Sequence, residues 1–388
     1  MACRSQRSNR LMISPELLDR ARDAVRAGVA FLAEKQGADG SWTDFRIAVG
    51  ASTEWVTGYI GTAMCRVSKL GLADGRSASL SDRAATFISN AEHDGGGWGF
   101  NARAGIDADS TANCLRLLTV TDRLNEDRAS RLSALLRSHQ NEDGGFGTFC
   151  LAGIQAEVRR GNPYFRAIAD PARLATHFRG WCSSDPQISA IAFRALSAED
   201  KRDVSIEDRI AQFLAACQNH DGSWNAYWSN GALLGTAHVL IAFSDCARLG
   251  DAIQCARSWL LREQRPDGSW TDGRRPRPTP YDTALALTAL LAVDRDARSE
   301  PAVASTTCLV REQQPDGSWR SFPHMKVPLP WDHSQLQTPT VQPEVEDAGR
   351  LFTSATATQA LAEWIGRAEE VTRDSGASAR GGVTHARR

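Results

Sequence analysis

The sequence predicts an all-α protein, an (α/α)6 toroid in which six helical hairpins close into a ring. Three observations lead to this prediction. A short motif ending in an aromatic residue occurs six times, helices with one apolar face alternate with helices that are apolar all round, and no convincing strand pattern occurs in the 388 residues. Six hairpins would use residues 14–368, so we expect a single domain.

The repeated motif consists of a Gln or His, then a Gly-rich step that usually contains Asp-Gly, and then Trp or Phe. The aromatic ends are 56, 48, 78, 46 and 49 residues apart, so the period is close to 50 and the third unit contains an insertion. Asp-Gly stops a helix because Gly accepts the left-handed conformation, and the aromatic ring then covers the helix end. The copies are KQGADGSW (35–42), HDGGGW (93–98), HQNEDGGF (139–146), CQNHDGSW (217–224), EQRPDGSW (263–270) and EQQPDGSW (312–319).

Each hairpin should contain an amphipathic outer helix before the motif and a less polar inner helix after it. The first outer helix, 15–36, begins correctly at Ser14 and Pro15 and has Leu18 and Val25 on its apolar face. The inner helices are the ones that we expect to be packed on all sides. They are predicted at 53–69, 109–120, 185–196, 233–243, 281–291 and 353–364.

Four segments fall outside the hairpins. Residues 1–13 form an N-terminal arm, and residues 151–179 are the insertion, which should add a short helix at the rim. Residues 322–350 are a Pro-rich loop, whose length is typical of a functional lid or of disorder. The polar tail 369–388 is predicted to be disordered.

Composition excludes several classes of function. The 45 Lys and Arg nearly balance the 46 Asp and Glu, so the net charge of −1 provides no field that would attract nucleic acid. Nine cysteines are spread singly without a C-x-x-C pair, which argues against a disulfide framework or a zinc cluster and favours the cytoplasm. No apolar run is long enough to span a membrane, so we expect at most weak peripheral membrane contact.

The candidate site lies where the inner helices begin, because in such a ring their N-termini all meet at one end of a central cavity. Asp107 and Asp109 are the one close acidic pair there, in a Asp-x-Asp-Ser-Thr step. This step is interpreted either as a simple helix cap or as a carboxylate pair with a chemical role. Further candidates at the same end are Glu54, Trp55, Asp185, Gln187, Tyr227, Trp228, Asn230, Tyr281, Asp282, Thr353 and Ser354.

These residues carry a resemblance to a known family. The six units resemble the QW repeats of squalene-hopene cyclases and other triterpene cyclases, and GGWGFNARAGIDADSTA (96–112) is similar to the segment that presents that family's Asp-x-Asp-Asp-Thr-Ala motif. The likeness covers most of residues 14–364, including 221–240 and 267–290. It implies class II terpene cyclisation, in which a carboxylic acid protonates an alkene or epoxide and a carbocation cascade closes rings.

The resemblance also implies roles for individual residues. Asp109 takes the position of the general acid and Asp107 that of its neighbour, while Ser110 replaces the last Asp of the motif. Phe100 and Trp228 take the positions of aromatic residues that stabilise cations. The His that supports the acid in squalene-hopene cyclases would fall on Ile191, so the acid's hydrogen-bond donor is left unidentified. Trp55, Phe100, Trp228, Tyr281 and Asp282 are therefore the predicted substrate-binding residues, and Asp107, Asp109 and Ser110 the predicted catalytic ones.

The expected substrate is a linear isoprenoid of C15–C20 or a prenylated aromatic, because a single toroid lacks the second domain that helps to enclose C30 chains. No metal or other cofactor is expected, except Mg²⁺ if the substrate is a diphosphate. Arg274, Arg275 and Arg277 are interpreted either as contacts to such a diphosphate or as an ordinary surface loop.

The alternatives are a non-catalytic prenyl or lipid carrier and two other toroid enzymes. A protein prenyltransferase β subunit would hold zinc with Asp, Cys and His, but Tyr281-Asp282-Thr283 has no Cys nearby. A sugar-processing toroid would need two facing carboxylates, for which Asp109 with Asp282 or Asp185 could serve.

Overall fold

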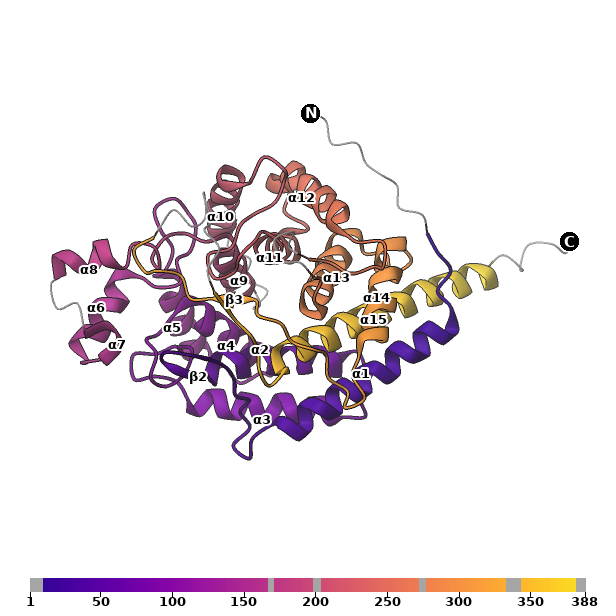
Figure 1. Ribbon diagram of the computed structural model, residues 1–388, viewed down its shortest axis with the longest axis horizontal. Coiled ribbons are helices and arrows are strands. Elements are labelled where there is room, and N and C mark those ends of the chain that lie inside the picture. Colours follow the sequence, from indigo (N-terminus) through magenta and orange to yellow (C-terminus); the bar gives the residue numbers. More distant parts are fainter. Residues whose placement is uncertain (1–9, 167–170, 198–203, 272–276, 333–342, 382–388) are drawn as a thin grey trace, which may run out of the picture.

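The computed structural model describes residues 10–166, 171–197, 204–271, 277–332 and 343–381, and over these ranges the chain is an α/α toroid (Figure 1). The predicted fold class is confirmed. The outer helices are α1 (Pro15–Lys35), α3 (Arg76–Asn90), α5 (Glu126–Arg137), α10 (Val204–Cys217), α12 (Gly250–Glu263) and α14 (Glu300–Glu312). The inner helices are α2 (Glu54–Lys69), α4 (Ala108–Val120), α9 (Pro186–Leu196), α11 (Leu233–Phe243), α13 (Pro280–Asp294) and α15 (Leu351–Gly381).

The inner helices form a closed ring. Each one packs on the next in the order α2, α4, α9, α11, α13 and α15, and α15 packs again on α2. Figure 1 shows the consequence at the ends of the chain, where α15 lies along α1. The inner helices are buried on nearly all sides, as their apolar sequences predict; in α13 every residue from Pro280 to Leu291 is buried.

The repeated motif ties each outer helix to the next one. In the last unit the Gln313 side-chain amide donates to the carbonyl oxygens of Gly317 and of Ala24 on α1, at 2.9 and 2.8 Å. The indole of Trp319 donates to the carbonyl oxygen of Leu309 at 2.8 Å. Because α14 is the last outer helix and α1 the first, these contacts help to close the ring. The same contacts recur at Gln36 and Trp42, Gln218 and Trp224, and Gln264 and Trp270.

The motif needs glycine for a second reason. Gly317 has φ +85°, and a Cβ there would lie 2.3 Å from the carbonyl oxygen of Ala27. A side chain at this position would therefore push α1 away from the turn, and the left-handed backbone would add strain.

Replacing Gln313 by Ala should destabilise the fold by about 1–3 kcal/mol, because two half-buried amide hydrogen bonds are lost, one of them across the ring closure to Ala24. The measurement is the free energy of unfolding in urea. Gln314→Ala is the matched control, since the Gln314 amide donates only to the neighbouring Glu312 carbonyl. Equal stability of the two variants would contradict a ring-closing role for Gln313.

Short elements complete the fold around one end of the ring. The insertion forms three short helices, α6 (Leu151–Arg159), α7 (Pro163–Arg166) and α8 (Pro171–His177), which make a lobe at the edge of the molecule (Figure 1). A one-turn 3₁₀ helix, η1 (Ala247–Leu249), precedes α12. Strands β1 (Asp44–Ile47) and β2 (Gly50–Ser52) pair antiparallel, as do β3 (Met325–Lys326) and β4 (Glu344–Val345). The sequence does not reveal these strands because two to four residues are too few for an alternating pattern.

The prediction for the C-terminal tail was wrong over residues 369–381. Helix α15 continues through Gly381, whereas residues 382–388 lie outside the described residues. The physical reason is visible where the helix leaves the ring: Glu369 accepts a hydrogen bond from Arg22 of α1 at 2.8 Å, and no proline interrupts the following turns. Of the predicted N-terminal arm, residues 1–9 also lie outside the described residues, and Leu11 donates to the Arg298 carbonyl at 2.7 Å.

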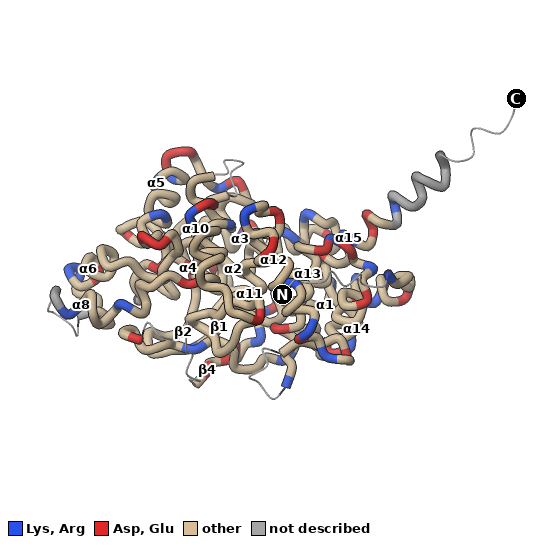
Figure 2. The backbone as a smooth tube through the Cα atoms, turned by 90° about the horizontal axis from the view of Figure 1, so that it is seen from above, with Lys and Arg blue, Asp and Glu red and all other residues tan. Residues whose placement is uncertain are grey.

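The charged residues are distributed without a dominant patch. Figure 2 shows Lys and Arg interspersed with Asp and Glu along the whole tube, as the small net charge predicts. In the part of the chain that the structure describes, no helix combines the length and the apolar character that crossing a bilayer requires.

Candidate active site

A cavity of about 380 Å³ lies within the ring. Every inner helix contributes to its wall at positions i, i+4 and i+7, the spacing that keeps side chains on one face of a helix, and α4 adds Ser110. The first residues form a layer that we call the acid layer: Trp55, Asp109, Gln187, Leu234, Tyr281 and Phe352. The middle layer is Tyr59, Asn113, Ile191, His238, Leu285 and Thr356, and the far layer is Thr62, Arg116, Arg194, Ile241, Thr288 and Gln359.

Loops cover the cavity beside the acid layer. The turn of the β1–β2 hairpin contributes Ile47 and Val49, and the long Pro-rich loop contributes His324, Met325 and Val327. Part of the predicted Pro-rich loop therefore borders the cavity, while its residues 333–342 are outside the described part of the chain.

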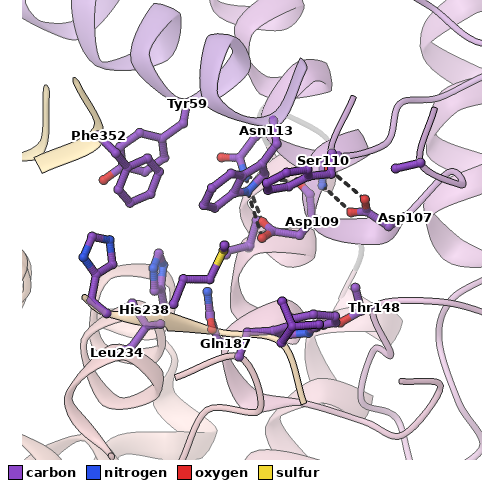
Figure 3. A pocket seen from close by; sticks show the side chains of 18 of the residues that line it. Tyr59, Asp107, Asp109, Ser110, Asn113, Thr148, Gln187, Leu234, His238 and Phe352 are labelled. Atoms are coloured by element: carbon purple, nitrogen blue, oxygen red, sulfur yellow. Dashed lines mark hydrogen bonds between the residues drawn. The ribbon is translucent and has the colours of Figure 1, made fainter. Parts of the chain in front are cut away.

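Asp109 is positioned by two neighbouring side chains (Figure 3). The indole N–H of Trp55 donates to its Oδ2 at 2.9 Å, and the side-chain amide of Asn113 donates to its Oδ1 at 2.8 Å. The pKa of Asp109 is raised to about 8, chiefly by burial and second by the nearby Asp107, whereas the two donors act in the opposite direction. Asp109 therefore keeps its proton near neutral pH, while both donors stabilise the carboxylate that remains after proton transfer.

Asp107 is the N-cap of α4. Its Oδ1 accepts from the backbone N–H of Ser110 at 2.7 Å and its Oδ2 accepts from the Ser110 hydroxyl at 2.8 Å. Burial raises the pKa of Asp107 to about 7. The Asp-x-Asp-Ser-Thr step was interpreted either as a helix cap or as a carboxylate pair with a chemical role. Asp107 is the helix cap, which Ser110 completes, whereas Asp109 faces the cavity and is available for chemistry.

Aromatic rings line the cavity beside Asp109. Phe352 stacks on Tyr59 with ring centroids 4.0 Å apart and on Trp55 at 4.9 Å. Tyr281 lies 5.5 Å from Phe352, and Phe100 stacks on the other side of Trp55 at 5.9 Å. Faces of aromatic rings attract cations and do not react with them, so this wall suits a positively charged hydrocarbon.

No group of three or more His, Cys, Asp or Glu that could hold a metal ion occurs within the described ranges. The arrangement at the acid layer is instead that of a single protonated carboxyl group facing an apolar, aromatic cavity. Such a group can transfer a proton to a weak base such as an alkene.

The sequence matches a model of the prenyltransferase alpha-alpha toroid domain over residues 50–243, which is half of the chain. The chain belongs to the prenyltransferase α/α-toroid family. A second model, the squalene-hopene cyclase C-terminal domain, matches residues 183–333. The predicted kinship to squalene-hopene cyclases and class II terpene cyclases is therefore confirmed.

Relatives of this toroid protein include solved and curated terpene cyclases. A variant of the type II terpene cyclase MstE from Scytonema, in complex with its substrate geranylgeranyl dihydroxybenzoate, is 26% identical with a TM-score of 0.76, over 91% of this chain and 99% of that chain. Squalene–hopene cyclase from Zymomonas mobilis is 28% identical over 53% of this chain and 33% of its own length. Terpentedienyl-diphosphate synthase from Kitasatospora griseola is 32% identical over 22% of this chain and 17% of its own length. The matched region is thus a third or less of these two curated relatives.

Most of the residues predicted for the site lie at the cavity of this class II cyclase-like toroid. Asp107, Asp109 and Ser110 line it, as do Trp55, Phe100, Trp228 and Tyr281. Asp282 does not: it is buried beside the cap of α13, where its backbone N–H donates to the Thr279 hydroxyl at 3.0 Å. The reason is helical geometry, because Asp282 follows Tyr281 by one residue and so lies about 100° further around the helix.

Sequence reasoning missed several residues of the toroid cavity. The hydrogen-bond donor to Asp109 is unidentified from the sequence, because Ile191 replaces the His of squalene-hopene cyclases. The structure shows two donors, Asn113 and Trp55. Asn113 and Tyr59 could have been found from their spacing, because each lies four residues after a predicted site residue on the same helix. Phe352 was missed because the last inner helix was predicted to begin at residue 353, whereas it begins at Leu351.

Replacing Trp55 by Phe should lower kcat about tenfold and move the alkaline limb of the pH–rate profile to higher pH. The reason is that the carboxylate of Asp109 loses a donor worth about 1.5–3 kcal/mol, so the carboxyl becomes a weaker acid. Trp228→Phe is the matched control for the position of the alkaline limb, because that indole donates to the Thr148 hydroxyl and not to Asp109. An unchanged alkaline limb in the Trp55 variant would contradict this role.

Proposed function

We propose that this protein is a class II terpene cyclase in which Asp109 protonates the terminal alkene of a linear prenyl substrate. The observation that carries the proposal is Asp109 itself: a buried carboxyl group with a pKa of about 8, hydrogen-bonded on both oxygens and facing an aromatic-lined cavity. The family relationship supports the same assignment.

The steps follow from these positions. The O–H bond of Asp109 breaks as a C–H bond forms at the alkene, which leaves positive charge on the more substituted carbon. Attack by the next double bond closes a ring and moves the charge along the chain, where aromatic rings that line the cavity, among them Phe352 and Tyr59, stabilise it by roughly 1–2 kcal/mol each. Loss of a proton ends the cascade, so substrate and product have the same atoms and the reaction is an isomerisation.

The proposed substrate is a C15–C20 isoprenoid or a prenylated aromatic. A volume of about 380 Å³ lies at the small end of ligand cavities, which run from about 300 to 1,000 Å³, and this favours a shorter chain than C30. The related MstE, whose substrate is geranylgeranyl dihydroxybenzoate, supports the prenylated aromatic. Protonation by a carboxyl group needs no cofactor, and Mg²⁺ would accompany only a diphosphate substrate.

The test is incubation of the purified protein with farnesyl diphosphate, geranylgeranyl diphosphate, geranylgeranyl dihydroxybenzoate and squalene, followed by mass spectrometry of the products. We expect a cyclic isomer from at least one of the first three. Binding without any product would instead identify a prenyl or lipid carrier, and the absence of both would exclude the proposed function.

We further propose a cytoplasmic enzyme that contacts membranes weakly. Val327, Leu329 and Trp331 are exposed apolar residues on the long loop, and Val327 also lines the cavity, so this loop is a suitable route for an apolar substrate. In sedimentation with phosphatidylcholine vesicles, a minor fraction of the protein should pellet, and the fraction should fall in Trp331→Ser. Equal pelleting of the variant would exclude this loop as the contact.

A further inference from the structure

Two arginines lie in the far layer of the cavity, at the opposite end from Asp109. Arg116 of α4 and Arg194 of α9 both line the cavity and are otherwise surrounded by protein. Neither guanidinium has a hydrogen bond or an ion pair with a residue of the described ranges. Both side chains are half-buried and face the cavity. Two cations held there without a partner are costly, because each has lost part of its hydration and gained no compensating charge.

The surroundings do not neutralise this charge. The nearby carboxylate, Glu363, already pairs with Arg66 at 2.6 Å and accepts from the Gln359 amide at 2.9 Å. The pKa of Arg194 is lowered to about 10, chiefly by burial and second by the positive charge of Arg66, so Arg194 remains a cation at neutral pH. Three arginines therefore face one glutamate at this end of the cavity.

A neighbouring histidine also lacks a partner. His238 on α11 lines the cavity, and its Nδ1 is buried with no hydrogen-bond partner among the described residues. Burial lowers the pKa of His238 to about 3, so the ring is neutral and offers a hydrogen bond without adding charge. An unsatisfied buried nitrogen beside two unpaired guanidiniums indicates a polar ligand at this place.

We propose that Arg116, Arg194 and His238 form an anion-binding subsite, which holds the carboxylate or diphosphate head group of the substrate while the terminal alkene reaches Asp109. This inference rests on the proposed cyclase function and adds the charge and orientation of the substrate. Guanidinium groups present planar forks of N–H donors that match both carboxylate and phosphate oxygens.

The geometry of α4 supports the orientation. Arg116 follows Asp109 by seven residues on the same helix face, so the two lie about 10 Å apart along the cavity. A folded prenyl chain between them would present its alkene to the acid and its head group to the arginines.

The subsite would also help the chemistry. Two uncompensated guanidinium charges would repel a carbocation that moves down the cavity, and a bound anion removes this repulsion. Both arginines lie in the C-terminal halves of their helices, where the helix dipole favours a cation. The stabilisation from the dipole is small compared with the cost of removing a charge from water. Of the arginines considered at first for a head group, Arg277 is exposed, and Arg274 and Arg275 lie outside the described residues.

The experiment compares three ligands of the same chain length on the Asp109→Asn protein, which should bind without turnover. Geranylgeranoic acid supplies a carboxylate, geranylgeranyl diphosphate a diphosphate, and geranylgeraniol a neutral head group. Titration calorimetry should show that at least one of the anionic ligands binds about tenfold or more tightly than the alcohol, and which of them does so identifies the source of the anion. Equal affinity for all three would overturn the subsite, even if the protein cyclises.

Variants then test the two arginines. Arg116→Gln and Arg194→Gln should each weaken binding of the preferred anion about tenfold and leave the affinity for geranylgeraniol within about twofold. Arg26→Gln, on the outer face of α1, is the control and should change neither. Equal weakening of alcohol and anion would show a structural role only. If an arginine variant does not fold, the comparison of the three ligands on the Asp109→Asn protein still tests whether the anion subsite exists. Product analysis of the wild-type protein tests cyclisation separately.

Discussion

Replacing Asp109 by Asn is expected to reduce cyclisation by at least about 10³-fold while leaving the fold intact. An amide of the same size fills the same place, but it has no acidic proton to transfer, and proton transfer by a positioned acid contributes about 10²–10⁴-fold to rate. The alkene is also such a weak base that water cannot replace the acid inside the cavity. The measurement is the rate of cyclic product formation under substrate saturation, with circular dichroism to confirm folding.

Two further variants make the Asp109 result specific. Asp23→Asn removes an exposed carboxylate of α1 and should leave the rate unchanged. Asp107→Asn keeps one oxygen that can cap α4, loses the second oxygen that accepts from the Ser110 hydroxyl, and removes the neighbouring carboxyl group; it should lower the rate less than Asp109→Asn does. Turnover by Asp109→Asn at the wild-type rate would remove Asp109 from the mechanism and return it to the role of a helix residue.

Activity should decline as the pH rises through about 8, by about tenfold for each further unit. Only protonated Asp109 can donate, and its pKa of about 8 is raised by burial first and by Asp107 second. Because Asp107, with a pKa of about 7, lies beside it, the observed limb reports the pair and not one residue alone. The measurement is kcat/KM between pH 5 and 10.

The free energy of unfolding must be measured over the same pH range, because the two raised pKa values predict that it falls as the pH rises. Both carboxyl groups have a higher pKa in the folded protein than the 3.8 of an ordinary Asp, so the folded state binds more protons than the unfolded state between about pH 4 and 8. Their contribution to stability is complete below pH 4 and is lost as the pH rises through 8. A rate that stays constant to pH 10 in protein that remains folded would contradict a carboxylic acid as the proton donor.

The candidate site was predictable where it depends on local spacing. Asp109 and Tyr281 were found because each stands at the start of an inner helix, and the ring places these starts together. Asn113 and Arg116 follow Asp109 by four and seven residues on the same face of α4, so the spacing also predicts them, but they were missed. Asp282 was assigned to the cavity because it also stands at the start of an inner helix, but it is absent from the residues that line the cavity.

The sequence by itself determined the ring. Its six motifs specify where each helix stops, and the apolar character of the inner helices specifies which of each pair is buried, because both depend on neighbours within one turn. Only the tertiary structure decided that Trp55 from one helix and Asn113 from another share Asp109, and that Arg116 and Arg194 meet without a carboxylate. The physical reason is that hydrogen bonding and burial depend on distances between helices, and these distances are set by packing around the closed ring.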